Sequence, residues 1–204
     1  MNEKKEITFI EMFCGVGGFR LGLERAGDIG GLLQGKEQED NGDIETKRHR
    51  FAWQSRIRFN CVWANDNDKY ACQVYRKRFG NKELVEGDIQ DIGPEDIPEH
   101  DFLTAGFPCQ AFSVAGKRKG FQDKTRGTLF YEICRVVRSK RPKYLLLENV
   151  KGLLSHNSGR TFAIILLSLD ELGYDVEWQV LNTKYWLPQN RERVFIFGIR
   201  REGG

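Results

Sequence analysis

The sequence predicts an α/β protein with a doubly wound, mainly parallel sheet that has an antiparallel strand near one edge. Short apolar runs, typical of buried strands, alternate along the chain with segments of helical periodicity, and this order is typical of βαβ units. The first run, residues 7–13, ends in a glycine-rich turn. Residues 174–181 instead alternate apolar and polar side chains, which indicates an antiparallel strand close to a sheet edge.

The individual elements follow from the same two periodicities and from the residues that interrupt them. Gly27 is expected to end the first helix, and Asp68 stands where the helix 69–79 needs an N-cap. Pro94 and Pro98 leave little room for a crossover helix before the fourth strand. We expect strands at 7–13, 60–64, 83–86, 101–105, 143–147, 174–181 and 194–200, and helices at 19–26, 69–79, 128–137 and 162–172.

The chain of 204 residues is long enough for one substantial core, so we expect a single domain over 1–204 with an insertion at about 28–59. The insertion has a weak apolar pattern and carries an acidic run followed by a basic run. A solvated surface segment is favoured over a nucleic-acid contact there, because a helix-to-strand connection lies at the rim of the sheet opposite the ligand edge.

The composition excludes several classes of protein and site. The five cysteines are scattered without CxxC spacing and the three histidines are dispersed, so neither a disulfide framework nor a metal site is expected. No apolar run is long enough to span a membrane, and no signal peptide precedes the first strand. A net charge of +3 favours an anionic partner only mildly. We therefore expect a protein of the cytoplasm or the nucleoid that is not secreted.

Side chains that can bind a ligand or react follow the carboxyl ends of the predicted parallel strands, where open α/β sheets bind ligands. The turn 14–18 follows the first strand, Asp66 the second, Asp88 the third, Cys109 the fourth and Glu148 the fifth. A lone cysteine is more often a small buried residue than a nucleophile. Two neighbouring features reverse that expectation for Cys109. The Glu148 carboxyl group follows buried leucines, which favours holding a proton. The loop 110–126 is basic and aromatic, which suits a lid on a phosphate backbone.

Three separated motifs resemble those of the DNA (cytosine-5)-methyltransferase family. They are Gly106-Phe107-Pro108-Cys109-Gln110, then Glu148-Asn149-Val150, then Gln189-Asn190-Arg191-Glu192-Arg193, in that order along the chain. The resemblance covers nearly the whole chain except the insertion. It implies a Rossmann-like fold of the S-adenosylmethionine-dependent methyltransferase type.

The resemblance implies binding of S-adenosylmethionine, with S-adenosylhomocysteine as product. Asp66 replaces the glutamate that usually binds the ribose, and Asn67 stands where the family commonly has a tryptophan. Asp88 corresponds to the acceptor for the adenine amino group, with Ile89 beside the ring. The implied cofactor-binding residues are Phe13, Gly15, Val16, Gly17, Gly18, Asp66, Asn67, Asp88, Ile89, Pro108 and Leu129.

The chemistry of cytosine agrees with these roles. Carbon 5 is too poor a nucleophile to attack a methyl sulfonium, and a thiolate that adds to carbon 6 activates it. We assign Cys109 as that nucleophile, Glu148 as the acid at N3, and Arg191 and Arg193 as the residues that orient the base and the glutamate. The target base must leave the duplex to be reached. The implied substrate-binding residues are Gln110, Ser113, Asn149 and Val150.

The expected partner is double-stranded DNA, with no metal and no membrane. The family normally continues beyond the last strand predicted here, so we expect an incomplete catalytic domain and a second chain or segment that supplies target recognition. Two alternatives remain: a tRNA cytosine-5 methyltransferase of the same fold, and a non-catalytic, regulatory subunit of a split enzyme. Residues 110–113, Gln-Ala-Phe-Ser, favour the DNA enzymes, and retention of Cys109, Glu148 and both arginines favours catalysis.

Overall fold

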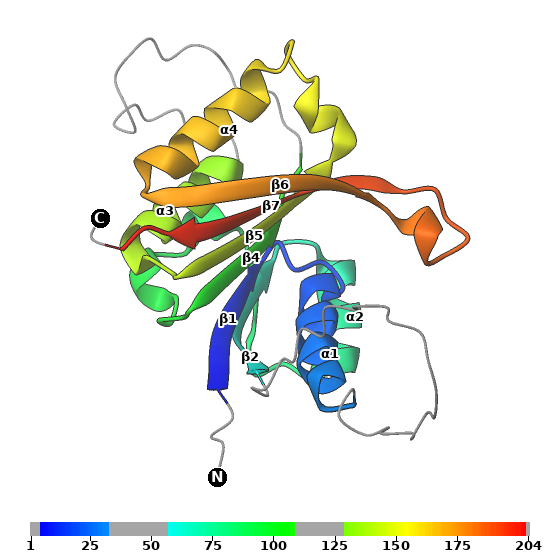
Figure 1. The fold of residues 1–204 in the computed structure, drawn as a ribbon. Helices are drawn as coiled ribbons and strands as arrows, with labels where there is room; N and C mark the ends of the chain where they lie inside the picture. The colour runs from blue at the N-terminus through cyan, green and yellow to red at the C-terminus, as the bar shows by residue number, and fades with distance from the viewer. Residues whose placement is uncertain (1–4, 33–56, 109–128, 203–204) are drawn as a thin grey trace, which may run out of the picture.

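The computed structural model describes residues 5–32, 57–108 and 129–202, which form one seven-stranded sheet with helices on both faces (Figure 1). The strand order is β3-β2-β1-β4-β5-β7-β6. The strands are β1 (Lys5–Met12), β2 (Ile57–Asp66), β3 (Leu84–Glu86), β4 (Phe102–Gly106), β5 (Tyr144–Val150), β6 (Tyr174–Asn182) and β7 (Glu192–Arg200).

The sheet has the predicted mixture of directions. Strands β1 to β5 pair in parallel, whereas β7 runs antiparallel to both β5 and β6. The predicted doubly wound, mainly parallel sheet with an antiparallel strand near one edge is therefore confirmed. The chain builds β2 and β3 on one side of β1 and then returns to place β4 on the other side, so the order reverses at β1 and β4.

The helices form two layers, one on each face of the sheet (Figure 1). One layer holds α1 and α2 over β1 to β3, and the other holds α3 and α4. The helices are α1 (Gly18–Leu32), α2 (Lys69–Phe79), α3 (Leu129–Lys140) and α4 (Arg160–Glu171), with short 3₁₀ helices η1 (Ile89–Asp91), η2 (Pro94–Asp96), η4 (Lys151–Leu154) and η5 (Thr183–Tyr185). None of the helices in the described part of the chain is both long and apolar enough to cross a bilayer.

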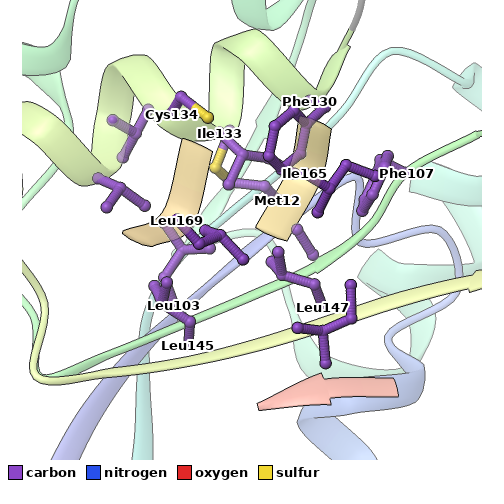
Figure 2. Close-up of a cluster of buried hydrophobic side chains, with 14 of the residues drawn as sticks. Met12, Leu103, Phe107, Phe130, Ile133, Cys134, Leu145, Leu147, Ile165 and Leu169 are labelled. Atoms are coloured by element: carbon purple, nitrogen blue, oxygen red, sulfur yellow. The ribbon is translucent and has the colours of Figure 1, made fainter. Parts of the chain in front are cut away.

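The main core lies between the sheet and the α3–α4 layer (Figure 2). Because side chains alternate across a strand, every second residue of β1, β4 and β5 faces this layer. Met12, Leu103, Leu145 and Leu147 contribute from the strands and meet Ile133, Ile165 and Leu169 of the helices, all nearly or fully buried. A second cluster, which includes Phe9 and Tyr75, packs under α1 and α2.

Strands β1 and β4 are locked together at the start of their pairing by Thr8 and Asp101. The amide and hydroxyl groups of Thr8 both donate to Asp101 Oδ2 at 2.9 Å, and the Asp101 amide donates back to Thr8 Oγ1 at 3.1 Å. These bonds join residues 93 positions apart in the sequence.

Several boundaries differ from those predicted. The expectation that the first helix ends at Gly27 is wrong, because α1 continues to Leu32. Glycine is only a weak stop signal when its backbone can stay helical. Strand β2 begins at Ile57 rather than at residue 60, because Ile57 and Phe59 both pack against the second core cluster. The predicted insertion therefore shares its first residues with α1 and its last with β2, and its remainder, 33–56, lies outside the described residues.

Two motif residues lie inside strands rather than after them. Glu148 belongs to β5, which continues to Val150, and Arg193 belongs to β7. Both strands are longer than their apolar runs because they pair with each other, Glu148 opposite Phe195 and Val150 opposite Arg193. The Asp68 N-cap prediction is confirmed, since its Oδ1 accepts from the amides of Tyr70 and Ala71.

Candidate functional site

The glycine-rich turn after β1 lies at the reversal point of the sheet and has a strained backbone. Phe13, Gly15 and Gly17 have φ angles of 55°, 54° and 82°, so three residues in five occupy the left-handed region. An aromatic residue there is a conformational outlier of the kind that clusters at ligand sites. A side chain on Gly17 would clash with the Phe79 ring, so this glycine also permits close packing of the turn on α2.

The turn presents its backbone openly on the other side. A Cβ at Gly15 or at Gly18 would meet no atom within 4 Å among the described residues, and Val16 is half exposed. A glycine turn between a strand and a helix that leaves room beside its backbone lets a cofactor approach closely. The residues present therefore fit the cofactor that the sequence implies.

Two carboxylates hold the turn in place from beneath. Asp66 Oδ2 accepts from the Gly15 amide at 2.7 Å, and Glu11 Oε1 accepts from the amides of Phe19 and Arg20 at 3.0 and 3.4 Å. Glu11 is fully buried in β1, and its Oε2 has no hydrogen-bond partner within the described parts of the chain. Burial raises the pKa of the Glu11 carboxyl from 4.5 to about 7, against the smaller, opposing effect of the two amides.

The remaining cofactor candidates lie along the same edge of the sheet. Asp66 ends β2, where its second oxygen accepts from the Asp68 amide at 2.8 Å, and Asn67 follows it on the surface. Asp88 caps η1 through Oδ1, which accepts from the Gln90 amide at 2.9 Å. Ile89 is buried, Pro108 is exposed, and Leu129 begins α3 with its side chain against the main core.

Arg135 of α3 braces the segment that carries Ile89. Its guanidinium donates to the carbonyl groups of Ile89 and Ile92 at 2.8 and 2.9 Å, and Glu132 Oε2 accepts from its Nε at 2.6 Å. Sequence reasoning missed both Glu11 and Arg135. The available signal for Glu11 was an acidic residue inside an otherwise apolar strand, whereas nothing in the sequence joins Arg135 to residues 89–92.

Glu148 is the centre of the second half of the site. Its Oε1 lies 2.8 Å from Arg193 Nε and 3.9 Å from Arg191 Nη2. A Cβ at Gly106 would lie 3.5 Å from Glu148 Oε2 and 3.8 Å from the Phe19 ring. The Glu148 carboxylate therefore lies close to the end of β4, next to the helix that follows the glycine turn.

The other members of that motif differ in their surroundings. Asn149 is buried, and its Nδ2 donates to the Phe107 carbonyl at 2.8 Å while its Oδ1 accepts from the Val150 amide. Its side chain thus positions the turn that leads toward Cys109. Val150 is exposed at the end of β5.

Cys109, Gln110 and Ser113 lie outside the described residues, as does the predicted lid loop. The cysteines that the structure describes are all buried. Desolvation raises the pKa of the Cys61 thiol to about 11 and that of Cys134 to about 12, and it also raises the pKa values of Cys14 and Cys72. These four thiols are poor sources of a thiolate at neutral pH.

Curated bacterial proteins are similar to this chain over almost all of its length. Type II methyltransferase M.NgoBI of Neisseria gonorrhoeae is 46% identical over 191 residues, which cover 93% of this chain and 50% of that protein. Type II methyltransferase M.HhaI of Haemophilus parahaemolyticus is 41% identical over 197 residues, with 96% and 50% covered. The chain thus spans about half the length of the curated relatives it matches.

Solved structures share the fold at lower identity. The Dnmt2 methyltransferase of S. pombe matches with a TM-score of 0.63 at 19% identity, over 98% of this chain and 51% of that one. The methyltransferase EhMeth of Entamoeba histolytica matches with a TM-score of 0.58 at 18% identity, over 97% and 54%. A family model described as C-5 cytosine-specific DNA methylase matches residues 7–203. The family model and the curated relatives show that the chain belongs to the C-5 cytosine-specific DNA methylase family.

Proposed function

We propose that the protein transfers a methyl group from S-adenosylmethionine to carbon 5 of a cytosine in double-stranded DNA, through a covalent adduct on Cys109. The observation that carries the proposal is the position of Glu148. Its carboxylate is paired with Arg193 above Gly106, three residues before Cys109, and beside the helix that begins at the glycine turn. An acid, a nucleophile and a cofactor turn would then meet at one edge of the sheet.

The residues of the chain divide the chemistry as follows. The Cys109 thiolate adds to carbon 6, and Glu148 donates a proton to N3, so the ring becomes an enamine with a nucleophilic carbon 5. S-adenosylmethionine supplies the methyl group. A base then removes the carbon 5 proton, the electron pair expels the thiolate, and the N3 proton returns to Glu148. Arg193 orients Glu148 in this scheme, because its Nε is ion-paired with Glu148 Oε1 at 2.8 Å.

The cofactor would be held by the turn that contains Phe13 and Gly15, by Asp66 at the end of β2, and by Asp88 with Ile89 after β3. The open faces of Gly15 and Gly18 support this assignment. A further segment, in the same polypeptide or another, would supply target recognition, since the relatives are about twice as long as this chain.

Trapping tests the catalytic proposal directly. A duplex that contains 5-fluorocytosine cannot lose its carbon 5 substituent as a proton, so the adduct accumulates. The chain would be incubated with this duplex and S-adenosylmethionine, alone and with the second half of M.NgoBI supplied in trans, and resolved on a denaturing gel. We expect a covalent adduct that disappears in Cys109→Ala and persists in Cys72→Ala.

The same assay separates the alternatives. An adduct on a tRNA that contains 5-fluorocytosine but not on DNA would favour a tRNA methyltransferase. The absence of any adduct under all conditions, with S-adenosylmethionine binding retained, would favour a regulatory subunit and refute the catalytic proposal.

A further inference from the structure

The end of the β6–β7 hairpin exposes three large apolar side chains in succession. Tyr185, Trp186 and Leu187 are 73%, 70% and 56% exposed. Figure 1 shows this end, coloured orange beyond β6, projecting well away from the rest of the sheet. Large apolar groups gathered on a surface usually mark a contact with another molecule.

The backbone beneath these side chains is rigidly held. The Trp186 and Leu187 amides both donate to the Thr183 carbonyl, at 2.9 and 2.8 Å, and the Thr183 amide donates to the Arg191 carbonyl at 3.1 Å. Thr183 Oγ1 also donates to the Gln189 carbonyl at 2.7 Å. These hydrogen bonds hold the turn in one conformation, so the three side chains are exposed in a fixed arrangement.

The position of the hairpin end relates it to the candidate active site. Because β6 runs parallel to β1, its carboxyl end lies at the same edge of the sheet as the glycine turn and Glu148. Arg191 links the two places, since its carbonyl closes the hairpin end and its guanidinium lies 3.9 Å from Glu148 Oε1. The hairpin end and Glu148 are thus linked through Arg191 at one edge of the sheet.

The charge and shape of the hairpin end favour nucleic acid over protein. Residues 183–191 include Lys184 and Arg191 and no acidic residue. The Lys184 ammonium lies 5.3 Å from the centre of the Tyr185 ring, whose centroid is 6.1 Å from that of Trp186. Aromatic rings interleaved with cations suit stacking on bases beside phosphates.

We propose that residues 184–187 form a second DNA contact, outside the base pocket, in which the Trp186 ring inserts between base pairs of the duplex that flanks the target cytosine and Lys184 pairs with a phosphate. Tyr185 lies edge-on to Trp186, at an interplanar angle of 78°, and supports the inserted ring. This inference rests on the proposed function for the identity of the ligand. It adds to that function a site for the flanking duplex.

Fluorescence anisotropy of a labelled duplex titrated with the chain tests the contact. Trp186→Ala should weaken binding by about 5- to 150-fold, which is the range for removal of one base-stacking ring. Trp186→Phe should restore most of the affinity, because the ring is retained. Leu167→Ala, which truncates an exposed apolar side chain on α4, is the matched control and should bind like the wild type.

Salt dependence distinguishes stacking from charge. Trp186→Ala should leave the slope of log affinity against log salt unchanged, whereas Lys184→Ala should make that slope shallower by about one phosphate contact. If Trp186→Ala binds the duplex with wild-type affinity, the proposal is overturned. This holds also if the variant loses self-association or binding to the second half of M.NgoBI, because the hairpin end would then be a protein contact. Failure of the wild-type chain to bind any duplex overturns it as well.

The binding assay and the trapping assay can fail separately. Loss of affinity in Trp186→Ala without any 5-fluorocytosine adduct would support the contact and refute the catalytic proposal. An adduct in the wild type together with full affinity in Trp186→Ala would support the catalytic proposal and refute the contact.

Discussion

Replacing Glu11 with glutamine should stabilise the protein above neutral pH and leave it nearly unchanged in acid. Glu11 is fully buried, its Oε2 has no partner among the described residues, and burial raises its pKa from 4.5 to about 7. The native state therefore holds a proton that the unfolded state has lost between these two values. The stability that this proton confers is complete below pH 4.5 and is lost as the pH rises through 7.

The size of the effect follows from the two pKa values. Each pKa unit corresponds to 1.36 kcal/mol, so ionised Glu11 costs about 3 kcal/mol at a pH above both values. Glutamine keeps an oxygen that can accept from the amides of Phe19 and Arg20 but cannot ionise. Arg20 and Glu24 are the charged groups that act on the pKa of Glu11, and both remain in the variant.

Urea unfolding of the wild type and of Glu11→Gln at intervals from pH 5 to pH 8 measures this difference. The stability of the variant relative to the wild type should increase by about 2 to 3 kcal/mol across that range. Glu177→Gln, which alters an exposed carboxylate on β6, should show no comparable trend. A difference between Glu11→Gln and the wild type that does not vary with pH would refute the reasoning.

Three further substitutions test the rest of the site. Gly17→Ala should destabilise the protein by at least about 2 kcal/mol in urea unfolding, because φ is 82° there and the methyl group meets Phe79; an unchanged midpoint would contradict this. Arg135→Ala should cost about 2 kcal/mol and weaken S-adenosylhomocysteine binding in calorimetry, because Ile89 loses its brace; wild-type affinity would contradict the bracing role. Arg193→Ala should lower methyl transfer about 100-fold with little change in cofactor affinity, and equal losses in both would point to misfolding.

The sheet could be predicted because its signals are local. Buried parallel strands are almost continuously apolar, and the alternation in 174–181 marked the antiparallel edge before any pairing was known. The Asp68 cap was equally local, since a capping side chain acts within three residues of its own position. The ordered motifs also named Glu148 and Arg193, whose side chains lie 2.8 Å apart, and their catalytic roles stay a prediction.

What could not be predicted depends on contacts between distant segments. In the sequence, Glu11 only interrupts an apolar strand. Its role depends on its hydrogen bonds to the Phe19 and Arg20 amides at the start of α1. Asp66 was predicted as a ribose ligand, and that prediction stays untested, but its bond to Gly15 joins residues 51 positions apart. The end of α1 was missed because propensity is a weak guide where tertiary packing decides.

The lock between Thr8 and Asp101 has a consequence for synthesis of the chain. Strand β1 becomes central only when β4 arrives, 93 residues later in sequence than Thr8. Until then β1 presents an unpaired, largely apolar edge to the surrounding solution, and such edges recruit other chains. We expect this edge to make the ribosome-bound chain prone to aggregation between the emergence of β2 and that of β4.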